Sequence, residues 1–301
     1  MQRAIIIIVR PYIHRELPGW GFIYRAFVGG YKRNWFWAGI KPFWMLEKSH
    51  KYLLHVDISH WSDRATFFLG RWYDLPTQLA LKKILKPGHA VVDIGANYGL
   101  MSLVSSSLVG NAGKIIAFEP NTEPRKRFKK NIFKNNISNI VVYNFALGSN
   151  ENTLELFVPY INSGEGTFGT PGYSSQEGYK VQCEVKIGDK ILQDLTFALI
   201  KIDVEGFEEA VLRGLEKTIE RCNPIFIVEM IRRHLTRCGS SIDNIFRFFE
   251  SRDYRGYLLS TRRVYLGRQL ELIDIVDSSR CPDGDILWIH KDDEQRKHLD
   301  I

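Results

Sequence analysis

The segment Ala90-Val-Val-Asp-Ile-Gly-Ala-Asn-Tyr-Gly99 constrains the fold of this chain more than any other. A short apolar run ends in an acid and then breaks into Gly95 and Gly99, which predicts a buried strand, a tight turn and the start of a helix. Ligands of open parallel sheets bind beyond the carboxyl ends of the strands, and backbone that lacks Cβ atoms can approach them closely. We therefore expect this turn to bind a small molecule.

The residues of the turn restrict the class of ligand. A dinucleotide site needs G-x-G-x-x-G, but Asn97 occupies the second glycine position and no phosphate-binding lysine follows, so a nucleotide-dependent oxidoreductase is not expected. The carboxylate of Asp93 would repel a phosphate and would attract a cation. A sulfonium and an amino group are both cations, which indicates S-adenosylmethionine. Glu119 ends the next apolar run and is expected to bind the ribose hydroxyls.

Length and composition predict one large α/β domain with an extension, since the chain has 301 residues and is 45% hydrophobic. Four scattered cysteines form no C-x-x-C pair, so we expect neither a zinc site nor a disulfide framework, and a cytoplasmic protein. The apolar stretch Ala4–Val9 is far shorter than the ~20 residues of a membrane-spanning helix. Peripheral attachment to a membrane stays open.

The net charge of +7 does not by itself indicate a nucleic-acid partner. The densest basic run, Arg125–Lys130, lies on a predicted helix that also has an apolar side at Phe128, Ile132 and Phe133. Such a run is typical of a solvated helix face, and no base-reading motif accompanies it. We do not expect RNA or DNA as a substrate.

Residues 1–73 form a distinct aromatic-rich arm. The arm is expected to pack onto the main domain, while some aromatic rings could instead stack on sugars, close over the cofactor cleft, or contact a membrane or a second copy of the chain. Glycines interrupt it, so short helices are expected, with a strand at His55–Ser59. Six of the seven tryptophans lie here: Trp20, Trp35, Trp37, Trp44, Trp61 and Trp72.

From Asp74 onward, strands and helices alternate. Nearly continuous apolar runs are typical of strands buried on both faces of a parallel sheet, so we expect a doubly wound, mostly parallel α/β sheet in residues 74–290 and a charged tail in 291–301. The expected parallel strands are Val91–Ile94, Lys114–Phe118, Ile140–Phe145, Phe197–Ile202 and Pro224–Met230. The expected helices include Tyr98–Val109, Glu123–Asn135, Glu208–Glu220 and one capped by Ser240 or Ser241.

Two extended strands are expected at Thr153–Val158 and Lys180–Ile187, on either side of a Gly/Ser-rich loop. The loop, residues 162–175, is long enough to gate a substrate. Gly256–Thr261 and Asp285–His290 are expected to be the antiparallel strands that close the sheet.

Carboxylates recur at the ends of the expected parallel strands. Asp203 and Glu205 follow one strand, and Glu229 ends the next, with His234 five residues later. The carboxyl ends of parallel strands share one sheet edge, so these groups should converge with Asp93 and Glu119 on one cleft.

The chain here resembles the FkbM-type family of S-adenosylmethionine-dependent methyltransferases. The similarity rests on Val92–Gly99, Ala117–Pro120, Asn144–Gly148 and, most specifically, Ile200-Lys-Ile-Asp-Val-Glu-Gly206, and it spans roughly residues 70–235. It implies a Rossmann-like class I fold and O-methylation of hydroxyls on a sugar, a glycan, or a glycosylated or polyketide natural product. The residues it implies for the cofactor are Asp93, Gly95, Ala96, Asn97, Tyr98, Gly99, Glu119, Pro120, Asn144, Ala146 and Asp203.

The catalytic group has several candidates. A hydroxyl is a poor nucleophile at neutral pH, so a general base is expected, with Asp203 first, followed by His234 and Glu229. Alternatively, Asp203, Glu205 and Glu229 would hold Mg²⁺ against the acceptor oxygen. N-methylation of a small molecule, or a non-catalytic, membrane-peripheral protein that keeps the fold, also stays open.

Overall fold

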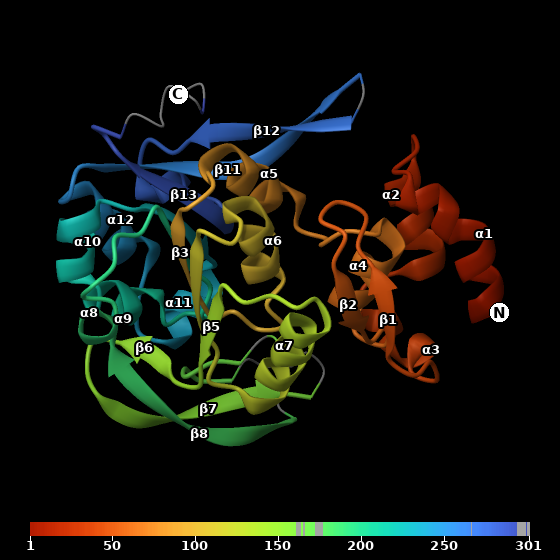
Figure 1. The fold of residues 1–301 in the computed structure, drawn as a ribbon, viewed down its shortest axis with the longest axis horizontal. Coiled ribbons are helices and arrows are strands. Elements are labelled where there is room, and N and C mark those ends of the chain that lie inside the picture. Colours follow the sequence, from red (N-terminus) through yellow and green to blue (C-terminus); the bar gives the residue numbers. More distant parts are fainter. Residues whose placement is uncertain (161–163, 165, 172–176, 266, 294–298, 300–301) are drawn as a thin grey trace.

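The computed structural model describes the chain except for residues 161–163, 165, 172–176, 266, 294–298 and 300–301. Its centre is a sheet of eight described strands in the order β12-β11-β13-β10-β9-β3-β4-β5 (Figure 1). The five strands from β10 to β5 are parallel, and the other three add antiparallel pairs at one side. The expected doubly wound, mostly parallel sheet is therefore confirmed. The strands are β3 (Ala90–Ile94), β4 (Lys114–Phe118), β5 (Ile140–Tyr143), β9 (Leu199–Ile202), β10 (Ile225–Met230), β11 (Tyr254–Val264), β12 (Gly267–Asp274) and β13 (Gly284–His290).

Helices cover both faces of this sheet, because alternate side chains of each strand point to opposite faces. Val91 of β3 packs with α5 and α6, whereas Val92 and Ile94 pack with α9, α10 and α12. The side chain of Asp74 caps α5 by accepting from the Thr77 N–H, which fixes where this helix starts. The helices are α5 (Leu75–Ile84), α6 (Leu100–Val109), α7 (Thr122–Lys134), α8 (Gly188–Ile191), α9 (Glu208–Arg213), α10 (Glu216–Cys222), α11 (Arg232–Arg237), α12 (Ile242–Glu250) and the 3-10 turn η3 (Ser278–Arg280).

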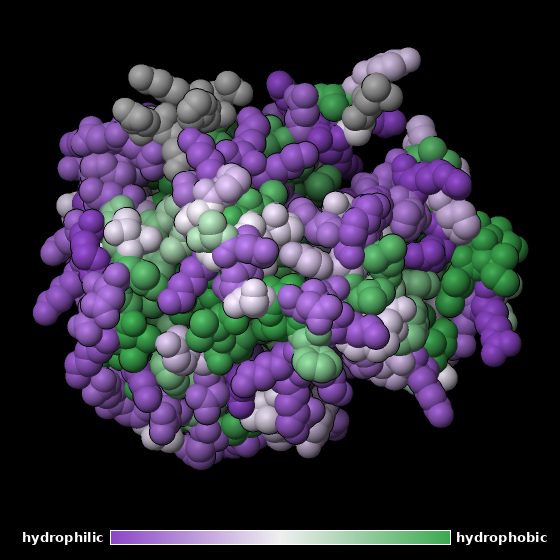
Figure 2. Space-filling view, in the orientation of Figure 1, coloured by the Kyte–Doolittle hydropathy of each residue, from purple (hydrophilic) through white to green (hydrophobic). Residues whose placement is uncertain are grey.

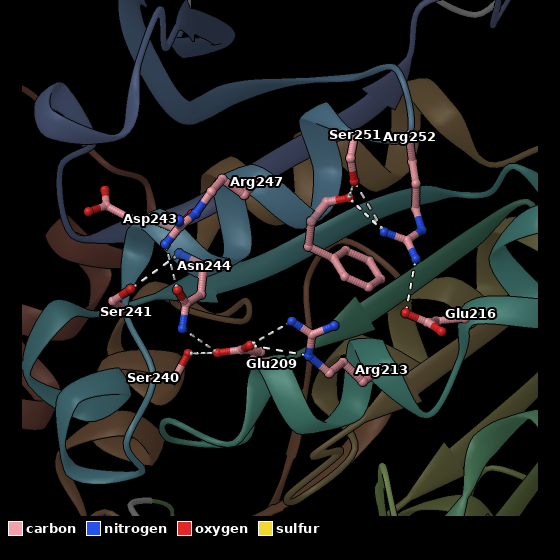
Figure 3. A network of polar contacts seen from close by, with 11 residues as sticks. Glu209, Arg213, Glu216, Ser240, Ser241, Asp243, Asn244, Arg247, Ser251 and Arg252 are labelled. Atoms are coloured by element: carbon pink, nitrogen blue, oxygen red, sulfur yellow. Dashed lines mark hydrogen bonds and ion pairs between the residues drawn. The ribbon is translucent and has the colours of Figure 1, made fainter.

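Polar contacts join α9, α10 and α12, which cover one face of the sheet (Figure 3). The carboxylate of Glu209 on α9 accepts from Asn244 Nδ2 of α12 at 2.9 Å and from the hydroxyl of Ser240. Arg252, just after α12, donates to Glu216 of α10 at 2.9 Å. These contacts fix the helices that support β9 and β10, the strands that carry the expected catalytic acids.

The N-terminal arm forms a lobe beside α6 and α7 (Figure 1). Two backbone N–H groups of its strand β2 donate to asparagine side chains at α7. His55 N–H donates to Asn131 Oδ1 at 2.9 Å, and Leu53 N–H donates to Oδ1 of Asn135, the residue after α7, at 2.7 Å. An ion pair between Arg127 and buried Asp63 adds a third link. The elements of the arm are α1 (Gln2–His14), α2 (Trp20–Ile23), η1 (Tyr24–Val28), η2 (Tyr31–Arg33), α3 (Asn34–Trp37), β1 (Phe43–Leu46), β2 (Leu53–Val56) and α4 (Trp61–Leu69).

Some expected elements differ from the observed ones. The helix expected at Glu208–Glu220 breaks at Gly214, where a Cβ atom would lie 2.1 Å from the carbonyl oxygen of Gly148. The arm contains a helix of 13 residues, α1, rather than short helices alone, and its strand ends at Val56 instead of covering His55–Ser59. Strand β5 ends at Tyr143, because the chain then bends into the second sheet.

That second sheet has the order β6-β8-β7 and comprises β6 (Ala146–Gly148), β7 (Asn152–Pro159) and β8 (Gly178–Ile187). It carries the loop that we expected to gate a substrate, much of which lies outside the described residues. The described Thr167 exchanges backbone hydrogen bonds with Phe157, and its hydroxyl donates to the carbonyl of Glu205 at 3.0 Å. The described part of the loop therefore lies against the turn that follows β9. Among the described helices, none is both long and apolar enough to cross a membrane.

Candidate active site

A cavity of about 640 Å³ opens at the carboxyl edge of the parallel strands. The turns after β3, β4, β9 and β10 supply its polar wall, and Trp61, Trp72 and Tyr73 of the arm supply aromatic rings. Pockets of this size, with few polar groups on an apolar lining, are typical of small-molecule sites, and this edge is where parallel sheets bind ligands.

Gly95 sets the shape of the turn after β3. Its φ of +83° lies in the left-handed region, and a Cβ atom there would lie 1.8 Å from the carbonyl oxygen of Asp203. The N–H groups of Gly95 and Ala96 both donate to the carbonyl of Phe118 at 3.0 Å, while the Asp203 N–H donates to the carbonyl of Ile94 at 3.0 Å. The turn is therefore held against the ends of both neighbouring strands, β4 and β9.

Glu119, after β4, faces the same turn. Its carboxylate accepts the N–H groups of Asn97 and Asn121, each at 2.7 Å. Burial raises the pKa of Glu119 to about 7, although these hydrogen bonds oppose the shift. Asn97 has a φ of +51°, and its buried Oδ1 has no hydrogen-bond partner among the described residues. The pair offers unfilled hydrogen-bonding capacity to a ligand that carries hydroxyl groups.

Asp93, at the end of β3, is almost fully buried. Its carboxylate accepts from the Ser102 hydroxyl of α6 at 2.6 Å. Burial raises its pKa to about 6, against the lowering effect of that hydrogen bond. Asp93 therefore fixes the first turn of α6 and also lines the cavity.

A buried lysine joins two of the acids. The ammonium group of Lys201, on β9, lies 2.9 Å from Asp203 Oδ2 and 3.5 Å from Asp285 Oδ1. Burial alone would lower the pKa of Lys201, but Asp203 and Asp285 raise it well above its usual range. Lys201 is therefore charged, and it fixes the side chain of Asp203 at the cavity wall.

Glu205, Glu229 and His234 form a second cluster. His234 Nδ1 lies 2.6 Å from Glu205 Oε2 and 3.8 Å from Glu229 Oε2, while Arg233 Nε lies 3.1 Å from His234 Nε2. Burial alone would lower the pKa of His234, but the two glutamates raise it to about 9. The Nδ1 atom therefore holds a proton between the carboxylates.

The pKa of Glu229 in this cluster is raised. Burial, reinforced by the negative charge of Asp203, raises the pKa of Glu229 well above the usual range, although the hydrogen bond from His234 opposes this. A carboxyl group with a raised pKa is a stronger base once it is deprotonated.

A comparison of the sequence with models of protein families identifies the family, and the matched segment contains this site. A family model described as Methyltransferase FkbM domain matches residues 93–255, more than half of the chain. The chain belongs to the FkbM methyltransferase family. The expected resemblance is thereby confirmed, and the matched segment contains the turn after β3 and the ends of β4, β9 and β10.

The FkbM chain has more distant similarity to individual proteins. Methyltransferase 1 of Beauveria bassiana (strain ARSEF 2860) is 28% identical over 145 residues, which are 42% of this chain and 58% of that relative. The chain thus spans little more than half the length of this curated relative. The Methyltransferase FkbM structure from Methylobacillus flagellatus KT has 16% identity over 79% of this chain and 56% of that one, with a TM-score of 0.39. An O-methyltransferase structure from Thermotoga maritima has 13% identity over 74% and 68%, with a TM-score of 0.39.

Most of the residues expected from the sequence line the cavity of this member of the FkbM methyltransferase family. Two do not: Gly99 starts α6 with a φ of +80° and packs against Phe128, and Asn144 is exposed in the bend after β5. Those that line it are Asp93, Gly95, Ala96, Asn97, Tyr98, Glu119, Pro120, Ala146, Asp203, Glu229 and His234.

Several groups in the cavity had no role assigned from the sequence. Lys201 could have been recognised because it is a charged residue within the apolar strand Leu199–Ile202, and a buried lysine needs an acidic partner. Asp285 of β13 lies opposite Glu229 of β10 in the antiparallel register. Its place in the cavity could have been inferred from the expected antiparallel strand, whose first residues lie at the carboxyl edge of the parallel strands. The roles of Trp61 and Trp72 at the cavity were among the open interpretations of the arm.

The described residues can also form a metal site. Glu205, Glu229 and His234 each place one ligand atom within 4.8 Å of the others. Carboxylate and imidazole groups ligate divalent cations, but the imidazole must be deprotonated at the ligating atom. A metal ion here would therefore displace the proton that His234 Nδ1 shares with Glu205.

Proposed function

We propose that this FkbM methyltransferase transfers a methyl group from S-adenosylmethionine to a hydroxyl group of a sugar, a glycan, or a glycosylated or polyketide natural product. The observation that carries the proposal is the convergence of Glu119, Asp203 and Glu229 on one cavity that Trp61, Trp72 and Tyr73 also line. The four free cysteines are compatible with the cytoplasm as the proposed compartment.

The donor half of the site consists of the turn after β3 and Glu119. A bound S-adenosylmethionine would supply an electrophilic methyl group. Glu119 would accept from the ribose hydroxyls, and the Gly95 turn would allow the cofactor to lie close to the backbone. Asn97 Oδ1, which lacks a partner among the described residues, would accept a further hydrogen bond.

The acceptor half consists of Asp203, Glu229 and the aromatic residues of the arm. Lys201 holds Asp203, which orients the acceptor hydroxyl, and Glu229 takes its proton. Because the two glutamates raise the pKa of His234 to about 9, it is already protonated near neutral pH, so it positions Glu205 and Glu229 and does not accept the proton itself. Orientation contributes roughly 7–11 kcal/mol in favourable cases. A general base adds ~10²–10⁴ in rate.

The donor site is tested by calorimetry with S-adenosylhomocysteine. Glu119→Ala is expected to weaken binding by about 10- to 100-fold, because one or two hydrogen bonds to a charged group are lost. Glu123→Ala removes an exposed acid of the neighbouring helix α7 and should leave the affinity unchanged. Unchanged affinity in Glu119→Ala, with thermal unfolding showing a folded protein, would contradict the assignment.

The acceptor class is tested by transfer of a radiolabelled methyl group onto pools of glycans and natural products. Label that enters hydroxyl-bearing sugars supports the proposal. Label that enters only amines would instead establish N-methylation, the alternative left open by the sequence. A chain that binds S-adenosylhomocysteine but labels nothing in either pool would favour a non-catalytic role.

The two versions of acceptor activation differ in their response to chelators. If Glu229 acts directly as the base, activity is expected to survive dialysis against EDTA. Loss of activity that Mg²⁺ or Mn²⁺ restores would show instead that Glu205, Glu229 and His234 hold a cation. A mock dialysis without EDTA is the control for loss of protein.

A further inference from the structure

The outer face of α1 is apolar and has no partner in the described chain. Ile7 and Ile8 are 72% and 73% exposed, and Met1, Ala4 and Pro11 are exposed beside them. At 3.6 residues per turn, these positions occupy one face, opposite buried Ile13. Figure 2 shows the resulting hydrophobic surface over α1, at the right edge of the molecule.

Positive charge surrounds this apolar face. Arg3, in the first turn of α1, and Arg15, which caps its C-terminus, are both exposed. Residues 1–73 contain eleven lysine and arginine residues and four acidic residues, so the arm carries a formal charge of +7, equal to that of the whole chain. The charge asymmetry of this protein is therefore confined to the arm that exposes the apolar face.

Further exposed apolar residues lie in elements that pack beside α1. Phe22 of α2 is 70% exposed and Trp35 of α3 is 77% exposed. The side-chain amide of Gln2 donates to the carbonyl of Phe36, so α3 is joined to the start of α1. Aromatic rings of this kind are enriched at membrane–water interfaces.

We propose that α1 docks this protein on the surface of a membrane that contains anionic lipids. A helix with one apolar face flanked by basic residues lies in the plane of the interface, with its apolar side among the acyl chains and its arginines at the headgroups. A second copy of the chain fits this face less well, because a symmetric contact would bring together two arms of charge +7. The inference does not depend on the methyl acceptor.

The test is co-sedimentation of the full chain with vesicles of phosphatidylcholine, with and without phosphatidylglycerol. Binding is expected only to the anionic vesicles and should decrease as salt is added. The double variant I7E/I8E is expected to bind at least about tenfold more weakly, because it places two charges on the inserted face. Light scattering in the absence of lipid measures the oligomeric state of each protein.

The matched control is the double variant F133E/V276E. It introduces the same two charges at residues that are 86% and 71% exposed outside the arm, and it should bind as the wild type does. Equal binding to neutral vesicles, retention of binding in I7E/I8E, or equal loss in the control would overturn the proposal. A dimer that forms without lipid and dissociates in I7E/I8E would overturn it too, by assigning the face to self-association.

Discussion

Replacing Gly95 with alanine is expected to abolish binding of S-adenosylhomocysteine and, with it, methyl transfer. The new Cβ atom would lie 1.8 Å from the carbonyl oxygen of Asp203, a separation that no rotamer change can relieve because the backbone fixes the positions of both atoms. The turn after β3 would have to move away from β9. That movement would displace the donor half of the site from the acceptor half.

The control for this substitution is Gly88→Ala. Gly88 has a similar φ of +87°, but nothing lies within 4 Å of the position that its Cβ atom would occupy. Only the left-handed backbone conformation is penalised there, at a cost of roughly 1–2 kcal/mol. Thermal unfolding and calorimetry on both variants separate the two effects. Nanomolar to micromolar binding retained by a folded Gly95→Ala protein would show that the close approach is not required.

The parallel part of the sheet was predictable because its strands are buried on both faces. Such strands must be almost entirely apolar, so the runs that became β3, β4 and β10 stand out from the chain around them. Strand β12 lies at the sheet edge, with exposed and half-buried residues, and its sequence carries no comparable signal. The helix α1 was obscured because its outward face is apolar as well as its inward one.

The acids of the site were predictable for a topological reason. The carboxyl ends of parallel strands lie at one edge of the sheet, so the sequence alone was sufficient to place Glu119, Asp203 and Glu229 in one cleft. Their partners could not be placed in this way, because which acid Lys201 meets depends on strand order and register. The pairing of Asp285 with Glu229 likewise depends on β13 running antiparallel to β10.

The contacts of the acceptor half distinguish the three expected catalytic residues. Asp203 is held by the ammonium of Lys201, and His234, whose pKa the two glutamates raise to about 9, is already protonated near neutral pH. Glu229 lines the cavity, and burial raises its pKa well above that of an ordinary glutamate. A raised pKa makes the deprotonated carboxylate a stronger base, which favours Glu229 for the proton transfer.

Glu229→Gln is therefore expected to lower kcat by about 10²–10⁴, with little change in binding of S-adenosylhomocysteine. A base acts only when deprotonated, so the wild-type rate should rise with pH through the raised pKa of Glu229, and the variant should lose this rise. Glu250→Gln, an exposed acid at the end of α12, is the matched control and should behave as wild type. If Glu229→Gln keeps the wild-type rate and pH profile while Asp203→Asn loses activity, Asp203 is the base, and Glu229 serves only to hold His234.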